Sequence, residues 1–337
     1  MKYCQSYLLL IILCFIINFS GLSQDRTIKI GINLCGAEFG DKNLPGVINQ
    51  DYIYPTENDI QYFVRKGFKL IALPFRWERI QHQPFAALDD AELRRIANFI
   101  SKCNKYNIQV SLTMQNFAAY NSQNKELLLG SPQLSFKAFK DVWRKIAGSL
   151  INFDNIYGYD IMNEPRRIFD NAWFKAAQSA ITGIREVDTV TNIIIDGENS
   201  SFAYDWKFDN NKLRKLKDPY DKIIYDAHCY FDFDHSGRYN TKFDRKIDPN
   251  MGVQSVKPFV DWLKKYKKKG IIGEFGVPAS DGRWLEVMDN FLAYIIKEGI
   301  SANYWAAGAW WHDYDLSIQP TNGYDKPQMS VLEKYVR

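Results

Sequence analysis

The stretch IYGYDIMNEP, residues 156–165, is a short apolar run that ends in an asparagine, a glutamate and a proline. A strand that is buried on both faces has such a near-continuous apolar run, and a carboxylate at its end is costly unless something uses it. The same pattern returns in KGIIGEFGVP, residues 269–278, where Glu274 follows another apolar run. Two strands that each end in a glutamate indicate a shared site at one end of a sheet.

Eight apolar runs of this kind alternate along the chain with segments whose apolar residues have helical spacing. The runs cover residues 27–36, 69–77, 108–116, 156–164, 191–198, 222–230, 270–276 and 302–310. The helical segments cover residues 56–67, 89–107, 135–152, 171–187 and 284–299, while residues 206–218 offer little more than a turn or two.

Alternating strands and helices predict parallel pairing, and eight such units in roughly 300 residues predict a single-domain α/β fold, the (β/α)8 TIM barrel. An open doubly wound sheet is the alternative, but no glycine-rich phosphate loop follows the first run. The active site of a TIM barrel lies at the carboxyl ends of its strands. Glu164 and Glu274 would therefore face one cleft from different sides of its rim.

The first 23 residues have the layout of a secretory signal peptide, with Lys2, an apolar run at 7–19 and a cleavage point after Ser23. The apolar run is too short to span a membrane. We therefore expect a secreted protein, extracellular or periplasmic, whose mature chain is residues 24–337. The net charge of +4 is small and the basic residues are spread out. We expect no nucleic-acid partner, no membrane partner after signal removal, and a monomer.

Three cysteines remain in the mature chain, Cys35, Cys103 and Cys229. Their number is odd and their spacing is unlike that of a metal site, so we expect buried, inert thiols. The four histidines are also scattered, at positions 82, 228, 235 and 312. The sequence therefore predicts neither a metal site nor a cofactor.

Two carboxylates in one cleft, without metal ligands around them, are the minimum for glycoside hydrolysis. Arg76 closes the second run and could hold one of the carboxylates in its charged form, although an ion pair with Glu78 is the alternative. His228 and Tyr230 are two residues apart on one strand and therefore share a face. A hydrogen-bonded pair in the core is the alternative for these two residues.

These motifs resemble glycoside hydrolase family 5, the largely cellulase and mannanase family of retaining, barrel-fold glycosidases. The resemblance covers nearly all of residues 27–337 and is strong because each motif stands at a different strand end. The motifs are LPFRW (73–77), MNEP (162–165), AHCY (227–230), GEFG (273–276) and YWAAGAWW (304–311). Within the family, the sequence is most similar to the branch typified by the secreted fungal endo-β-1,4-glucanases.

By that resemblance, Glu164 is the general acid/base and Glu274 is the nucleophile that forms a covalent glycosyl-enzyme. Asn163 would hydrogen-bond the sugar 2-hydroxyl at the −1 subsite. Tyr230 and Arg76 would orient and tune Glu274.

The resemblance further implies that His228 steadies Glu164 or the substrate and that Trp305 forms the stacking floor for the −1 sugar. One departure concerns residues 115 and 116, where the family pattern has His followed by Asn and this chain has Gln115 and Asn116. Glutamine can donate and accept hydrogen bonds but cannot carry a charge, which indicates altered activity or preference. Both residues are expected to bind substrate.

Aromatic side chains supply the binding half of the prediction, because sugar faces stack on flat rings. Trp310 and Trp311, beside Trp305, are the preferred candidates. Other aromatics that follow strand ends or lie in long connections are Phe117, Tyr120, Trp206 and Tyr314. For each of these rings, packing of the loop against the barrel is the alternative.

The sequence thus predicts a secreted endo-β-1,4-glucanase that acts on a polysaccharide, most simply β-glucan. A β-mannanase, a xyloglucanase or an exopolysaccharide-specific endoglycosidase are alternatives within the class, since the fold does not fix the sugar. A non-catalytic carbohydrate-binding barrel is a further alternative, and Gln115 is its only support.

Overall fold

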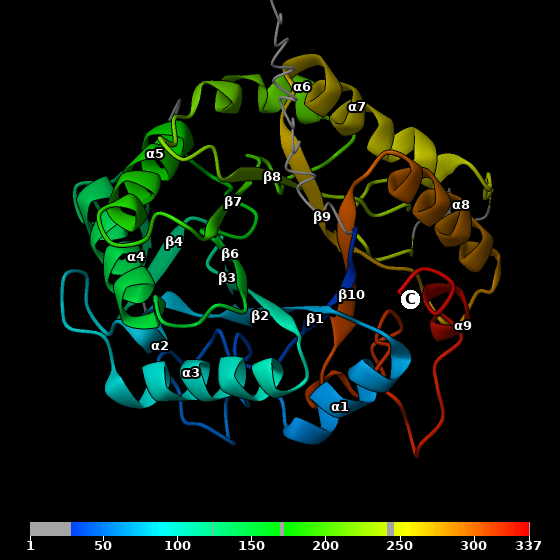
Figure 1. Ribbon diagram of the computed structural model, residues 1–337, viewed down its shortest axis with the longest axis horizontal. Helices are drawn as coiled ribbons and strands as arrows, with labels where there is room; N and C mark the ends of the chain where they lie inside the picture. Colours follow the sequence, from blue (N-terminus) through cyan, green and yellow to red (C-terminus); the bar gives the residue numbers. More distant parts are fainter. Residues whose placement is uncertain (1–27, 124, 169–171, 241–245, 337) are drawn as a thin grey trace, which may run out of the picture.

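The computed structural model describes residues 28–123, 125–168, 172–240 and 246–336. Eight parallel strands close into a barrel in the order β1, β10, β9, β8, β7, β6, β3 and β2. Helices surround this barrel as an outer ring (Figure 1). The predicted TIM barrel is confirmed, and the open doubly wound sheet is wrong. The expected signal peptide, residues 1–23, lies outside the described residues.

Each of the eight predicted runs coincides with one barrel strand, and two strands, β9 and β10, begin one residue before the run. The strands are β1 (Ile30–Leu34), β2 (Leu70–Phe75), β3 (Gln109–Met114), β6 (Ile156–Asp160), β7 (Asn192–Asp196), β8 (Ile223–His228), β9 (Lys269–Phe275) and β10 (Ser301–Ala307). The helices are α1 (Glu57–Lys66), α2 (Trp77–Ile80), α3 (Asp90–Lys105), α4 (Phe136–Leu150), α5 (Ala172–Arg185), α6 (Trp206–Asp209), α7 (Met251–Tyr266), α8 (Arg283–Lys297) and α9 (Met329–Leu332).

Local sequence signals explain several of these boundaries. Thr56 begins α1 with a capping box that it shares with Asp59, and Gly67 ends the helix at a φ of 99°, a left-handed conformation that favours glycine. The weak segment at 206–218 forms only the four-residue α6 and a short 3-10 helix, Asn211–Lys215. The carboxyl ends of the strands thus carry loops of very different length.

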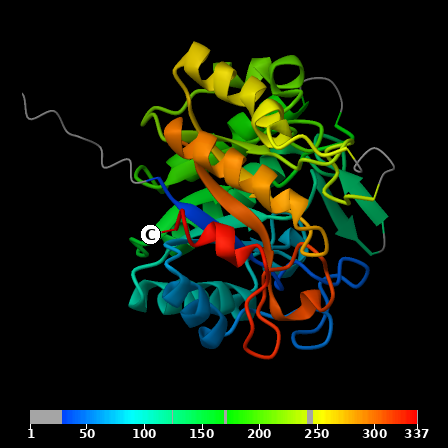
Figure 2. The same ribbon diagram turned by 90° about the vertical axis from the view of Figure 1, so that its right-hand side faces the viewer.

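One element was not predicted, an antiparallel hairpin that follows β3. Its strands are β4 (Ala119–Ser122) and β5 (Lys125–Leu128). In the side view of Figure 2 the hairpin stands out at one end of the barrel. It therefore adds to the rim at which the strands end.

The interior of the barrel changes character along its axis. Leu70, Ile194, Ile224 and Ile271 form a small apolar cluster separate from the main core. Ile194 also lines a cavity whose other walls are mostly polar side chains from the strands. The apolar cluster thus lies next to a layer of polar side chains inside the barrel. The residues of the candidate site belong to this polar layer.

Among the described residues, no helix is long and apolar enough to cross a membrane. Cys35, Cys103 and Cys229 are free and buried, as the sequence predicts. Packing and hydrogen bonds therefore hold the described fold together without a disulfide between these three residues.

Candidate active site

The structure brings Glu164 and Glu274 together around His228. The Nδ1 atom of His228 lies 3.0 Å from Oε1 of Glu164 and 3.5 Å from Oε2 of Glu274. One carboxylate oxygen of each glutamate and a ring nitrogen of His228 all lie within 4.8 Å of one another. The two strand-end glutamates predicted from the sequence therefore form one compact group.

Glu164 is held in place by backbone contacts beyond the end of its strand. The β6 ladder ends at Asp160, but the Asn163 N–H still donates to the Met114 carbonyl at 2.9 Å. Glu164 itself has a φ of 43°, a left-handed conformation that costs free energy for a residue other than glycine. Its N–H donates to Oδ2 of Asp196 at 2.8 Å, and this bond fixes the strained backbone.

Glu274 is buried near the end of β9, next to Tyr230. The Tyr230 hydroxyl donates to Oε2 of Glu274 at 2.7 Å. Burial raises the pKa of Glu274 to about 7, against the lowering effect of His228 and of the Tyr230 hydrogen bond. The preceding Gly273 leaves room for a carboxylate, because a Cβ there would lie 2.1 Å from Oδ2 of Asp226.

His228 acts as a buried positive charge between the carboxylates. Burial alone would lower its pKa, but Glu274 and Glu164 raise the pKa to about 10, so the ring is protonated at neutral pH. Its Nε2 lies 3.6 Å from Oδ2 of Asp196. His228, Asp196 and Asp226 also have ligand atoms within 4.8 Å of one another, but a protonated imidazole has no free lone pair for a metal.

Three buried aspartates below His228 were missed in the sequence. Asp160, Asp196 and Asp226 come from β6, β7 and β8, and burial raises the pKa of each, that of Asp160 to about 6. They belong to the polar layer, whose cavity is lined by Asn33, Ser111, Thr113, Asp160, Asn163, Ile194, Asp226, His228, Gly273, Glu274 and Asn303. The signal was present, because three consecutive apolar runs each contain an aspartate, and Asp196 and Asp226 are register partners in β7 and β8.

Comparison with known proteins assigns the chain to a family. The model of cellulases of glycosyl hydrolase family 5 matches residues 32–310. The chain belongs to this family. It is therefore a glycoside hydrolase, and the site that the two glutamates form is where catalysis is expected in a member of the family.

Curated and solved relatives agree with this assignment. Endo-beta-1,4-glucanase B of Emericella nidulans is 30% identical over 312 residues, which are 91% of this chain and 90% of the relative. The endoglucanase Cel5A of Pseudomonas stutzeri, solved with cellobiose, is 38% identical with a TM-score of 0.88, covering 92% of each chain. The endo-beta-1,4-glucanase Xac0029 of Xanthomonas axonopodis pv. citri is 30% identical with a TM-score of 0.85. The match covers 92% of this chain and 98% of that structure's chain.

In this family member, Arg76 does not contact the nucleophile. Its Nε donates to the Glu38 carbonyl at 2.9 Å, and its Nη2 lies 4.0 Å from Asp41. The guanidinium also lies 5.7 Å from the centre of the Phe117 ring. Among the described residues, no hydrogen bond or ion pair joins Arg76 to Glu274, so the predicted direct tuning of Glu274 by Arg76 is corrected.

Asn116 also differs from the prediction. Its side chain accepts from the Trp77 N–H at 2.8 Å and donates to Oε2 of Glu78 at 2.8 Å. A side-chain amide committed to these buried groups is not free to bind a sugar, so Asn116 is a structural residue. By contrast, the Oε1 atom of Gln115 and the Nδ2 atom of Asn163 are buried without a hydrogen-bond partner among the described residues.

The tryptophans predicted to stack on sugar lie on and after β10. Trp305 and Trp311 meet edge to face with centroids 5.8 Å apart, and Trp311 stacks on Tyr314 at 4.5 Å. Trp311 also contacts Phe39 from the loop after β1 at 4.9 Å. Trp310 is partly exposed on the short 3-10 helix Ala309–Trp311. These rings form one aromatic wall of the rim.

Two other aromatics are core residues. Tyr120 is buried and its hydroxyl donates to the Gln81 carbonyl at 2.8 Å. Trp206 is buried with its ring centre 4.6 Å from that of Phe259 on α7. For these two rings the sequence left sugar stacking and packing against the barrel as alternatives, and the structure shows packing.

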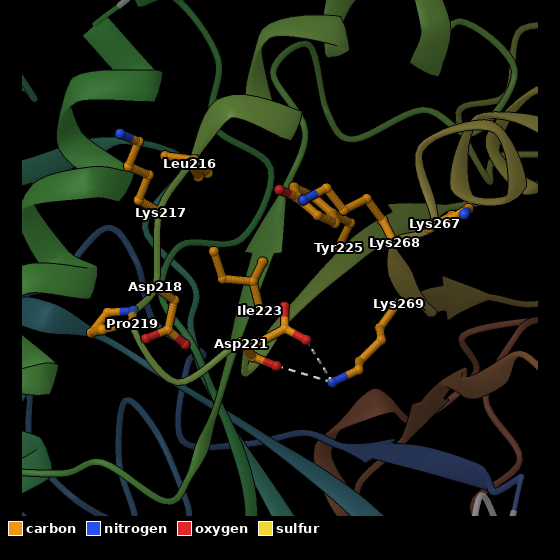
Figure 3. Close-up of a pocket in the computed structure, with 10 residues that line it drawn as sticks. All are labelled: Leu216, Lys217, Asp218, Pro219, Asp221, Ile223, Tyr225, Lys267, Lys268 and Lys269. Carbon is orange, nitrogen blue, oxygen red and sulfur yellow. Dashed lines mark hydrogen bonds and ion pairs between the residues drawn. The ribbon is translucent and has the colours of Figure 1, made fainter.

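A separate pocket opens at the amino end of the barrel, on the opposite side from the glutamates (Figure 3). Ile223 and Lys269, which stand at the starts of β8 and β9, are among its lining residues. Its carboxylate Asp218 is bound by Arg185 at 2.8 and 2.9 Å, a structural pair. Active sites of TIM barrels lie at the opposite, carboxyl ends of the strands, so we do not place chemistry there.

Proposed function

We propose that this protein is a retaining endo-β-1,4-glucanase that cleaves β-glucan by double displacement. The observation that carries the proposal is the close approach of the carboxylates of Glu164 and Glu274, within 4.8 Å. Retaining glycosidases hold their two carboxyl groups roughly 5–5.5 Å apart, whereas inverting enzymes leave roughly 6.5–9.5 Å for a water molecule. The short separation supports retention.

In the first step, the Glu274 carboxylate attacks the anomeric carbon and the bond to the leaving oxygen breaks. Glu164 gives its proton to that oxygen, and the sugar remains as an ester on Glu274. In the second step, Glu164 takes a proton from water, the water oxygen attacks the anomeric carbon, and the ester bond breaks. Glu164 is then protonated again and Glu274 is free.

The surroundings of the two carboxylates support these different roles. Glu274 is almost fully buried, which raises its pKa, but the hydrogen bond from the Tyr230 hydroxyl and the nearby His228 favour its ionised form. Glu164 is less buried and sits at the open side of the pair. The cationic ring of His228 lies between them and limits their mutual repulsion.

Substrate contacts follow from the same layer. The Nδ2 atom of Asn163 and the Oε1 atom of Gln115 are buried without a hydrogen-bond partner among the described residues, which supports a donor role for Asn163 toward the sugar 2-hydroxyl and an acceptor role for Gln115. Trp305 would form the floor under the −1 sugar, with Trp310 and Trp311 extending the aromatic wall. The names of the relatives favour β-1,4-glucan over mannan, xyloglucan or an exopolysaccharide.

We further propose that residues 1–23 direct secretion, to the medium or the periplasm, and that residues 24–337 act as a monomer. The apolar run at 7–19, with Lys2 before it and small residues after it, supports this proposal. N-terminal sequencing of the exported protein tests it, and a start at Gln24 is expected.

The test of the activity is reducing-sugar release from carboxymethylcellulose, barley β-glucan, xyloglucan, glucomannan and galactomannan. We expect release from the β-glucans by the wild type and none by Glu274→Ala. Release from mannans alone would replace the glucanase by a mannanase. Binding without release from any polymer would favour the non-catalytic barrel.

A further inference from the structure

We propose that the outer face of the barrel formed by residues 206–221 and 251–269 binds an acidic polysaccharide. This surface, the basic strip, comprises α6, the 3-10 helix Asn211–Lys215, the connection to β8, and α7 with the turn into β9. It lies outside the cleft of the two glutamates and is a binding surface only. The inference goes beyond the proposed function and does not depend on it.

Folding brings together basic residues from two distant segments of the chain. α6 lies beside α7, where the ring centroids of Trp206 and Phe259 are 4.6 Å apart (Figure 1). The two segments carry 11 of the 43 lysines and arginines but only 4 of the 39 acidic residues. The strip thus has a formal charge of +7, whereas the remaining 32 basic and 35 acidic residues give −3. A surface with such an excess of one sign attracts a polyanion.

Several of these charges are available to a ligand. Of the four acidic residues, Asp218 is already bound by Arg185, which lies outside the strip, at 2.8 and 2.9 Å. Lys207, Lys217 and Lys265 are exposed, and in the part of the chain that the structure describes they form no ion pair. Their ammonium groups can therefore meet the carboxylates of a ligand without first losing a partner.

Aromatic rings accompany two of these lysines. Phe208 is 73% exposed, and the Lys207 ammonium lies 4.8 Å from its ring centroid. Tyr266 is partly exposed, and the Lys265 ammonium lies 5.2 Å from its centroid. Flat rings stack on the faces of sugars, and the adjacent cations suit sugars that carry a carboxylate.

Two adjoining pockets give the strip its shape. The first includes Lys217 and residues 267–269 and has a volume of about 460 Å³ (Figure 3). The second lies between α6 and α7, includes Phe208, and has a volume of about 440 Å³. They meet where the ring of Tyr225 in the first lies 5.0 Å from the ring of Trp262 in the second. Each has the size of a pocket for a small ligand, and two in succession suit a chain.

The second pocket also contains unused hydrogen-bonding atoms. The Nε1 atom of Trp262 and the Oδ1 atom of Asn211 line it, and both are buried without a hydrogen-bond partner among the described residues. The first is a donor and the second an acceptor. A sugar hydroxyl can serve both, whereas the phosphodiester of a nucleic acid or a phospholipid only accepts. This pair therefore favours an acidic polysaccharide as the polyanion.

The experiment measures binding of the purified protein to polygalacturonate, a uronate polymer, by biolayer interferometry at low salt. We expect binding that weakens as salt is added, because salt screens the exposed charges. Changing Lys207, Lys217 and Lys265 together to glutamate should weaken it by about tenfold or more, and Phe208→Ala alone by about threefold. Neither variant should change kcat/KM on barley β-glucan, because the strip lies outside the cleft.

The matched control changes three exposed lysines on other helices to glutamate, Lys137 on α4, Lys175 on α5 and Lys297 on α8. It alters the net charge by the same amount and should bind as the wild type does. Equal weakening in the two triple variants would assign the effect to net charge and overturn the inference. A wild type that does not bind at low salt, or full affinity in Phe208→Ala, would also contradict it.

Two further polyanions test the identity of the ligand. Duplex DNA and vesicles of anionic phospholipid are compared with polygalacturonate at the same salt concentration. Tighter binding of either one would overturn the assignment to a polysaccharide. Because the readout is binding, a negative result leaves the proposed glucanase activity standing. A protein that binds polygalacturonate but cleaves no β-glucan would refute the activity and leave the basic strip in place.

Discussion

The hydrogen bond from Tyr230 to Glu274 gives a sharp prediction about pH. It joins the Tyr230 hydroxyl to Oε2 of Glu274 at 2.7 Å and favours the ionised form of the carboxyl group, whose pKa is about 7. A hydrogen bond to a charged group contributes about 1.5–3 kcal/mol, and one pKa unit corresponds to about 1.36 kcal/mol. Tyr230→Phe should therefore raise the pKa of Glu274 by about one to two units.

The nucleophile works only as a carboxylate, so a higher pKa removes activity on the acidic side. The assay is kcat/KM on cellopentaose from pH 4 to 9. At pH values below the wild-type pKa, we expect a loss of about 10- to 100-fold that becomes smaller as the pH rises. The acidic limb of the profile should move to higher pH.

The control is Tyr225→Phe on β8, the strand that ends two residues before Tyr230. Tyr225 is also buried, but its hydroxyl donates to the Leu213 carbonyl at 2.8 Å. Its loss should reduce stability without moving the acidic limb. If the limb of Tyr230→Phe stays where it is in the wild type, the hydrogen bond does not tune Glu274 and the reasoning is refuted.

Three further predictions concern mechanism and stability. With an activated β-cellobioside and azide, Glu164→Ala should yield the β-glycosyl azide and Glu274→Ala the α-azide, and reversed products by NMR would exchange the two roles. Gly273→Ala places a Cβ 2.1 Å from a buried carboxylate oxygen and should lower the free energy of unfolding by about 1–3 kcal/mol, measured in urea, whereas Gly282→Ala, with open space around it, should not. The pKa of His228 is about 10 when folded and about 6.5 when unfolded, so its contribution to stability is full below pH 6.5 and is lost toward pH 10. The slope of unfolding free energy against pH between 7 and 10 should flatten in His228→Asn, and an unchanged slope would contradict this.

The barrel could be predicted because its signals are local. An apolar run such as 270–276 carries its strand character in a few adjacent residues, and Glu164 and Glu274 mark the ends of their strands directly. Thr56 and Gly67 likewise act within one helix turn. Wherever the interaction is with near neighbours in the chain, the sequence alone was sufficient.

The features that the sequence did not reveal depend on contacts between segments that are distant in the chain. Asn116 was expected at the sugar, but it is bound by Trp77 and Glu78, which belong to α2. For Trp206 the sequence could not decide between the cleft and the core, and the contact with Phe259 on α7 places it in the core. The Asp160 and Asp196 carboxylates meet only because β6 and β7 pair in register. No single segment of the sequence contains this information.

The three cysteines have a practical consequence for biophysical work. Burial raises the pKa of all three thiols, that of Cys103 to about 12, so they carry almost no thiolate at neutral pH. A cysteine introduced on the surface, for example at Tyr220, would react with maleimide dyes far ahead of them. Residues 24–337, which lack Cys4 and Cys14, can thus be labelled with a fluorescent or spin label without prior removal of the three remaining thiols.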